Sequence, residues 1–108
     1  MTQNSNKLGE AQITELAEVF HLMGDASRLK IILCCLNEPV SVGVIAKRLG
    51  FSGSLVSHHL RLLRAARLLR SERKGKYVYC VVADEHIRCV LQDMIDHVSE
   101  PDEDIEGL

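Results

Sequence analysis

The spacing of apolar residues changes twice along this chain of 108 residues. Up to about residue 67, apolar side chains recur every three or four residues, which is typical of amphipathic helices. The segment Tyr77–Val82 instead alternates and is rich in β-branched and aromatic residues. Together with Leu69–Glu72 it flanks Lys74-Gly75, a sequence that favours a tight turn between two strands. Because residues 84–100 return to helical spacing, we expect a mainly helical chain with one β-hairpin.

Capping residues divide the first part of the chain into four helices. Asp25 and Ser41 are favourable N-cap residues for the second and third helices, and either Ser52 or Ser54 for the fourth. Two short helices joined by a glycine-containing turn form a helix-turn-helix, and a basic hairpin after it is a wing. The expected fold is therefore a winged helix-turn-helix with four helices, a two-stranded wing and a closing helix. The five helices are expected over residues 10–23, 26–36, 42–50, 54–67 and 84–100.

Charge is distributed very unevenly along the chain. Residues 28–76 contain eleven basic and two acidic side chains, although the formal net charge of the whole chain is −2. That segment matches a polyanion such as nucleic acid. We expect residues 9–100 to form the DNA-binding and dimerisation domain, residues 1–8 a disordered N-terminal arm, and residues 101–108 an acidic disordered tail.

The fourth helix has the composition of a DNA recognition helix. Short polar side chains near its start suit base edges in the major groove, and basic residues farther along and in the wing suit phosphates. Base or nearby phosphate contacts are predicted for Ser54, Ser57 and His58, and phosphate contacts for Arg61, Arg64, Arg73, Lys74 and Lys76.

A catalytic site is not expected. Ser57 and His58 are adjacent on a helix and therefore point about 100° apart, which does not align a nucleophile with its base. No third residue that would orient such a pair is evident in the sequence. The chain is thus expected to bind nucleic acid and not to be an enzyme.

The start of the chain and the cysteines indicate a compartment. The segment MTQNSNKLGE lacks the basic start and apolar run of a signal peptide, and no apolar stretch approaches the ~20 residues that span a bilayer. A cytoplasmic protein without membrane contact is therefore expected.

The cysteines lie within apolar segments and show no CxxC pairing, so reduced and mostly buried thiols are expected. They are Cys34, Cys35, Cys80 and Cys89.

Four segments, taken together, resemble one family. In order along the chain they read FHLMGDASRLKIILCCL, SLVSHHLRLLRAARLL, ERKGKYVYCV and DEHIRCVLQDMIDHVSE. Over about residues 10–100 the chain resembles the ArsR/SmtB family of bacterial metal-sensing transcriptional repressors. The resemblance implies a homodimer whose first and last helices form the interface. It also implies binding to operator DNA that weakens when metal binds, which derepresses metal efflux or sequestration genes.

The resemblance also implies where metal would bind. One type of site in the family uses a Cys-x-Cys pair in the third helix, where this chain has Ser41 and Gly43, so a thiolate-rich site is not expected. Another type uses the last helix, with the pattern D-x-H, ten residues, and H-x-x-E or H-x-x-H. The four places of that pattern are filled by Asp84, His86, His97 and Glu100.

Helix geometry supports such a site only in a dimer. His86 and His97 lie ~16 Å apart along the helix axis but within about 20° of one another around it, with Glu100 about 40° to the other side. In an antiparallel pair, Asp84 and His86 of one subunit therefore face His97 and Glu100 of the other, giving two equivalent sites. Two imidazoles and two carboxylates suit Zn(II) as effector, with Co(II) or Ni(II) possible.

Two alternative functions are compatible with the same fold. A repressor of this fold could sense oxidants or reactive sulfur through Cys34 or Cys35 paired with Cys89, although apolar surroundings raise a thiol pKa and slow oxidation. An architectural DNA-binding dimer without any effector would need only the basic segment, and the absence of stoichiometric metal uptake would identify it.

Overall fold

The computed structural model describes residues 8–101. The predicted arm 1–8 and tail 101–108 therefore lie outside the described residues, apart from Leu8 and Pro101. The helices are α1 (Glu10–Met23), α2 (Ala26–Cys34), α3 (Val42–Leu49), α4 (Gly53–Ala65) and α5 (Glu85–Ser99), and the strands are β1 (Val40–Ser41), β2 (Leu69–Lys74) and β3 (Tyr77–Val82).

The helix starts are fixed by the capping residues that the sequence indicates. The side chains of Asp25, Ser41 and Asp84 each accept a hydrogen bond from the backbone N–H three residues on, at 3.0, 3.3 and 3.0 Å. Ser52, and not Ser54, caps α4 in the same way at 3.1 Å. Each cap satisfies a backbone donor that the first turn of a helix leaves free.

Two helices end earlier than their apolar spacing predicts. The second ends at Cys34, not at residue 36, and the fourth ends at Ala65, not at residue 67. Arg67 adopts a left-handed backbone conformation with φ of 61°, which no α-helix can continue through. The N–H of Leu68 then returns to the carbonyl of Leu63 at 2.9 Å, as in a Schellman motif. This turn leads directly from α4 into β2.

The predicted two-stranded wing is present, but the sheet to which it belongs has a third strand that was not predicted. The sheet is antiparallel with three strands in the order β1-β3-β2, because Val40 and Ser41 pair with Cys80 and Tyr79 of β3. A strand of two residues carries no periodicity of its own, so the pattern of the sequence could not reveal it. The hairpin itself is confirmed, with β2 running on to Lys74 and Gly75 in the turn at φ of 65°.

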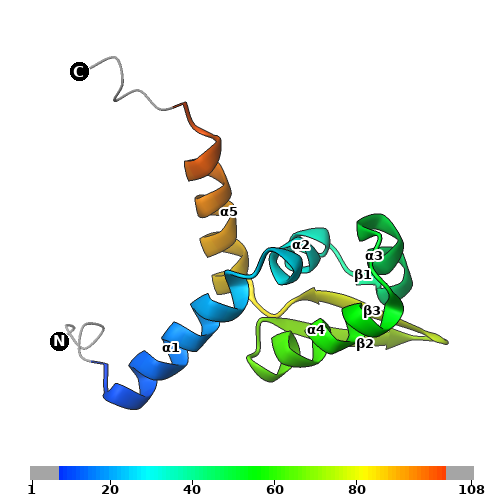
Figure 1. Cartoon of the computed structure of the whole chain (residues 1–108), viewed down its shortest axis with the longest axis horizontal. Coiled ribbons are helices and arrows are strands. Elements are labelled where there is room, and N and C mark those ends of the chain that lie inside the picture. The colour runs from blue at the N-terminus through cyan, green and yellow to red at the C-terminus, as the bar shows by residue number, and fades with distance from the viewer. Residues whose placement is uncertain (1–7, 102–108) are drawn as a thin grey trace.

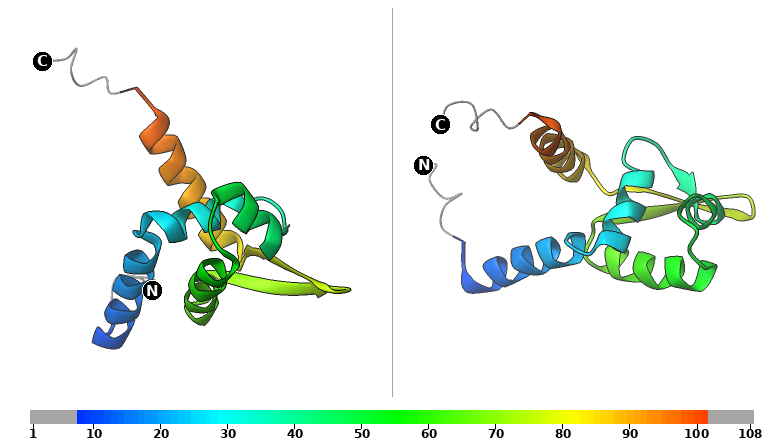
Figure 2. Two further views of the ribbon diagram at one scale, coloured as in Figure 1. Left: turned by 45° about the vertical axis from the view of Figure 1, so that its right-hand side comes forward. Right: turned by 45° about the horizontal axis from the view of Figure 1, so that its top comes forward.

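The core lies between the helix-turn-helix and the sheet. Helices α2, α3 and α4 pack together against the base of the sheet, whereas α1 and α5 extend away from this unit and the β2–β3 wing extends to the opposite side (Figure 1, Figure 2). The largest fully buried side chains are Ile31, Ile32, Ile45, Val56, Leu60, Leu63, Leu68 and Leu69, with Cys35 and Cys80. No helix within residues 8–101 is long and apolar enough to cross a membrane.

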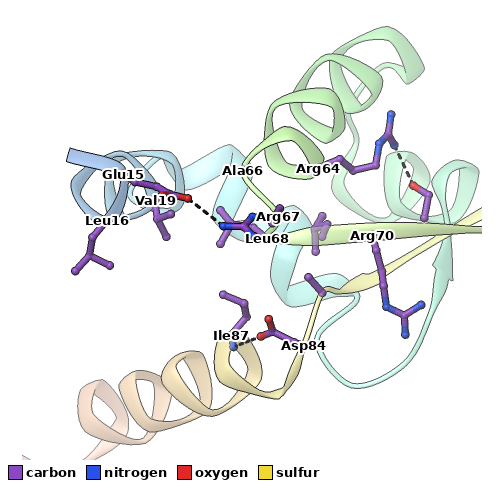
Figure 3. Close-up of a pocket in the computed structure, with 13 residues that line it drawn as sticks. Glu15, Leu16, Val19, Arg64, Ala66, Arg67, Leu68, Arg70, Asp84 and Ile87 are labelled. Atoms are coloured by element: carbon purple, nitrogen blue, oxygen red, sulfur yellow. Dashed lines mark hydrogen bonds and ion pairs between the residues drawn. The ribbon is translucent and has the colours of Figure 1, made fainter. Parts of the chain in front are cut away.

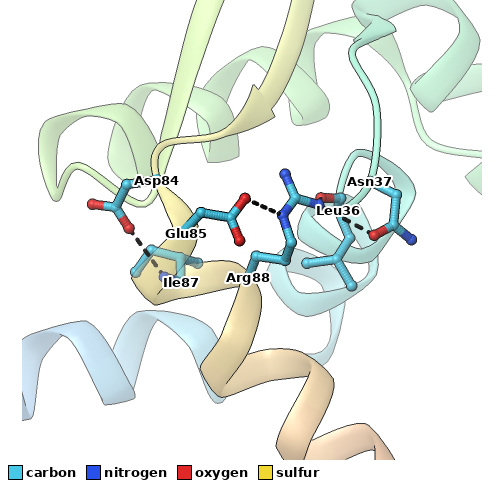
Figure 4. Close-up of polar contacts among 6 residues, drawn as sticks. All are labelled: Leu36, Asn37, Asp84, Glu85, Ile87 and Arg88. Carbon is cyan, nitrogen blue, oxygen red and sulfur yellow. Dashed lines mark hydrogen bonds and ion pairs between the residues drawn. The ribbon is translucent and has the colours of Figure 1, made fainter.

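One arginine attaches α5 to the helix-turn-helix unit. The guanidinium of Arg88 donates hydrogen bonds to the backbone oxygen of Leu36, to Asn37 Oδ1 at 3.2 Å and to Glu85 Oε2 at 2.9 Å (Figure 4). Its side chain is only 26% exposed. Because Leu36 and Asn37 follow α2 directly, Arg88 fixes the first turns of α5 against the end of α2.

Replacing Arg88 with Ala should lower the free energy of unfolding by about 2 kcal/mol, since hydrogen bonds from a charged, partly buried donor contribute more than neutral ones. Urea denaturation of the two proteins measures the difference. Arg70→Ala is the matched control, because Arg70 pairs only with Glu72 at the surface and its loss should cost no more than ~0.5 kcal/mol. Equal effects of the two substitutions would contradict an anchoring role for Arg88.

Candidate nucleic-acid interface and metal half-sites

The outer face of α4 presents the side chains predicted to read DNA. Val56, His59, Leu60 and Leu63 recur every three or four residues and are buried, which turns the residues between them outward. All five predicted contact residues of this helix are exposed: Ser54, Ser57, His58, Arg61 and Arg64. Their roles in binding DNA remain predictions.

The wing continues this basic surface. Arg73, Lys74 and Lys76 are exposed at and beside the hairpin turn. The ammonium groups of the two lysines lie 5.7 and 5.6 Å from the ring centroids of Tyr79 and Tyr77, respectively. Such cation–π contacts hold a flexible lysine near one position without neutralising it.

A hydrogen bond joins the recognition helix to the wing. Arg64 Nη1 donates to Ser71 Oγ of β2 at 3.1 Å (Figure 3). The guanidinium of Arg64 is therefore placed between α4 and the sheet, with its charge available to an anion. Sequence spacing alone could not indicate this contact, because it depends on how α4 packs on β2.

His59 is the one buried polar residue of the described core. Its side chain is 8% exposed, and Nδ1 has no hydrogen-bond partner. Burial, together with the nearby positive charges of Arg28 and His58, holds the pKa of His59 below its usual 6.5, and Asp25 opposes the shift. The folded state therefore favours the neutral imidazole.

Stability should fall as the pH drops below 6.5, because the unfolded chain binds a proton that the folded His59 does not. This contribution is complete above pH 6.5 and declines towards the lower pKa of the folded state. Urea denaturation at several pH values between about 5 and 8 measures it. His59→Leu, which fills the same buried position without titrating, should show a flatter profile over that range, and an unchanged profile would contradict the assignment.

The four predicted metal ligands all lie on α5 or at its cap, and all four are exposed. Within residues 8–101 of a single chain, no group of three or more His, Cys, Asp or Glu side chains lies close enough together to hold a metal ion. Asp84 uses Oδ1 to cap the N–H of Ile87, which leaves Oδ2 as a possible ligand. The four predicted ligands thus form two separate pairs, Asp84 with His86 and His97 with Glu100, at opposite ends of one helix.

Helices α1 and α5 leave apolar side chains uncovered in the single chain. Phe20 is 57% exposed, Met94 52% and Val98 74%. A cavity of about 120 Å³ between the two helices is almost wholly apolar, and His86 is one of the residues that line it. Contiguous apolar surface of this kind marks an interaction site on a small domain.

Asp84, one of the predicted ligands, lies beside the turn that ends α4. A hollow of about 840 Å³ is bounded by α1, by the turn through Ala66 and Arg67, and by Asp84 at the start of α5 (Figure 3). Across it, Arg67 Nη2 donates to Glu15 Oε2 of α1 at 3.1 Å. This contact joins α1 to the turn that follows α4.

The cysteines are less uniformly buried than expected. Cys35 and Cys80 are buried, but Cys34 is half-buried and Cys89 is exposed on α5. Burial raises the pKa of the Cys35 thiol to about 12 and also raises that of Cys80. A thiol with so high a pKa is almost entirely protonated near neutral pH, so Cys35 is a poor sensor of oxidants.

Helices α3 and α4, followed by the β2–β3 wing and bearing an exposed basic surface, define a winged helix-turn-helix DNA-binding protein. The family described as "Bacterial regulatory protein, arsR family" matches residues 25–71. A transcriptional repressor SmtB homolog from Synechocystis sp. is 35% identical over 91 residues, covering 84% of this chain and 69% of that protein. The chain belongs to the arsR family and is a transcriptional repressor of the ArsR/SmtB type, not an enzyme.

Other relatives and solved structures agree with this fold. The regulator KmtR from Mycobacterium tuberculosis is 32% identical over 88 residues, covering 82% of this chain and 68% of that protein. Reduced HlyU from Vibrio cholerae superposes with a TM-score of 0.76 at 22% identity, over 84% of this chain and 96% of that one. A homodimeric winged helix-turn-helix domain from Mycobacterium bovis superposes with a TM-score of 0.76 at 21% identity. The superposition covers 100% of this chain and 94% of that one. Regulators of the arsR family bind operator DNA as dimers.

Proposed function

We propose that the chain is a zinc-responsive repressor whose dimer binds operator DNA without metal and is released when Zn(II) binds. The observation that carries the proposal is the position of the four donors on one exposed helix, beside apolar surface that a single chain leaves uncovered. In this arrangement the metal effector needs a second subunit, because the described part of one chain, residues 8–101, brings no three donors together.

The proposed dimer pairs α5 with its copy in antiparallel fashion. The uncovered apolar residues of α1 and α5 would then be buried between subunits, and each end of one α5 would meet the opposite end of the other. Asp84 and His86 of one subunit would hold zinc together with His97 and Glu100 of its partner. Two imidazole nitrogens and two carboxylate oxygens fit tetrahedral Zn(II), and Co(II) or Ni(II) are possible substitutes.

One relative whose name includes a metal supports a metal signal of some kind. A cadmium resistance regulatory protein CadC homolog from Staphylococcus aureus is 31% identical over 87 residues. The absence of thiolates from the proposed donor set favours zinc over the softer cadmium for this chain.

Metal would act by favouring one arrangement of the dimer over another. Zinc need only bind more tightly to a dimer whose two recognition helices no longer match successive turns of the major groove. The hollow beside Asp84 offers a route, since α5 and the turn through Ala66 and Arg67 both border it. Each tenfold loss of operator affinity then requires ~1.4 kcal/mol of coupling.

Fluorescence anisotropy tests the proposal. A labelled duplex from the promoter region of the chain's own gene is titrated with protein in the presence of chelator and of buffered Zn(II), Co(II), Ni(II) or Cd(II). Tight binding that zinc weakens at least about tenfold is expected. Operator affinity that is unchanged by zinc would contradict the proposal. If stoichiometric metal uptake were also absent, only a DNA-binding dimer without an effector would be left.

A further inference from the structure

A second hollow lies on the DNA-reading side of the molecule. It has a volume of about 450 Å³ and is bounded by the first turn of α3, the outer face of α4 and the start of β3. Among the described residues that line it are three cationic side chains and no acidic one. The cations are Arg61, Arg64 and Lys76.

These cations come from α4 and from the wing, and all three line the same hollow. Arg61 and Arg64 are one turn apart on α4, and Arg64 is held to β2 by its hydrogen bond to Ser71 Oγ. Lys76, on the wing, lies over the ring of Tyr77, which also lines the hollow. Several converging guanidinium and ammonium groups favour an anion whose oxygens accept more than one hydrogen bond.

Gly43, in the first turn of α3, forms part of the wall of this hollow. A Cβ added there would meet nothing within 4 Å, and its φ is not positive. Neither packing nor backbone conformation within the chain therefore requires glycine, although glycine stabilises a helix less than alanine does. A close approach by another molecule is a further physical reason for a residue without a side chain.

We propose that this hollow seats a phosphodiester group of the operator backbone and that Gly43 lets the backbone approach α3. The DNA interface then includes α3 as well as α4 and the wing. A phosphodiester carries no base information, so the contact adds affinity and fixes the position of the recognition helix without adding sequence preference. The proposal rests on the function as an operator-binding repressor.

The substitution Gly43→Ala tests whether glycine at this position matters only to the fold of the chain or also to the approach of DNA. If only the chain itself matters, alanine raises the thermal unfolding midpoint and leaves DNA binding as it was. If the backbone of DNA approaches here, the midpoint still rises but the Kd becomes about tenfold weaker, equally for the promoter duplex and for a random duplex of the same length. Both are measured without metal, at a temperature at which circular dichroism shows both proteins folded.

The cations provide an independent measurement. Arg61→Ala and Lys76→Ala should each reduce the slope of log Kd against log salt concentration by about two, because each removes one phosphate contact from each subunit of the dimer. Arg70→Ala removes an exposed charge of β2 that does not line this hollow, and its slope should stay close to that of the wild type.

The outcomes distinguish this proposal from the one on which it rests. Weaker binding by Gly43→Ala together with reduced slopes for both hollow cations supports the phosphate site. Unchanged DNA affinity of Gly43→Ala overturns it, whatever the slopes show, and so do equal slopes for Arg61→Ala, Lys76→Ala and Arg70→Ala. A wild-type protein that binds neither duplex would instead contradict the proposed repressor function.

Discussion

His97→Ala is expected to keep its affinity for operator DNA without metal and to lose its release by zinc. The imidazole of His97 lies near the exposed end of α5, away from α4 and the wing, so its removal leaves the DNA-reading surface intact. It removes one of two nitrogen ligands from both sites of the proposed dimer at once. At zinc concentrations that release the wild type, the variant should stay bound, as measured by anisotropy.

His21→Ala is the matched control for this prediction. His21 is also an exposed helical histidine, but it lies on α1 and fills no place in the proposed ligand set. Its loss should leave zinc-induced release within about twofold of the wild type. Full release of His97→Ala by zinc would contradict the proposed site.

Met94→Asp is expected to separate the dimer into monomers and thereby to weaken both operator binding and zinc binding. Met94 is 52% exposed in the single chain, on the side of α5 that the proposed interface buries. A carboxylate buried there without a partner is strongly destabilising. A monomer binds one half of the operator only, so its affinity should fall by about 10² to 10⁴ through loss of the linked second contact. It should also bind no zinc tightly, because each site would lack two ligands.

Analytical ultracentrifugation, anisotropy and a zinc titration together check this prediction. Circular dichroism should show that Met94→Asp stays folded, since the core between α2, α3, α4 and the sheet does not include Met94. Gln92→Ala, an exposed position two residues away, controls for changes in α5 itself. A monomeric Met94→Asp that still took up one zinc per chain at wild-type affinity would show that the site does not need the partner.

Local signals in the sequence predicted most of the fold. Asp25, Ser41 and Asp84 cap helices where their side chains suit that role, and the alternating residues before and after Gly75 form the hairpin. Each of these features depends on residues close together in the chain, so the pattern of the sequence contains it.

Features that depend on distant residues were not predictable in this way. Strand β1 exists because Val40 and Ser41 pair with residues about forty positions farther on, and the contacts of Arg88 with Leu36 and Asn37 cross a similar distance. The early end of α4 depends on the left-handed backbone conformation of Arg67. Arginine is not a residue type that indicates such a conformation in a sequence.

The candidate metal site likewise has features that the sequence shows and features that only the folded structure shows. The spacing of Asp84, His86, His97 and Glu100 is visible in the sequence, and the structure adds that all four are exposed and that apolar residues of α1 and α5 lie uncovered beside them. The hollow around Gly43 could not have been found from spacing, because it is formed by side chains of three separate elements.

A complementation experiment tests the central claim, that each zinc site is shared between two subunits. His86→Ala and His97→Ala chains carrying different affinity tags are mixed, exchanged and purified as heterodimers. In such a heterodimer one site has lost both histidines, but the other keeps His86 from one chain and His97 from its partner. At a buffered zinc concentration that saturates the wild type but neither variant homodimer, the heterodimer should bind one zinc ion with wild-type affinity. A heterodimer that binds no more zinc than the two variant homodimers would contradict the claim.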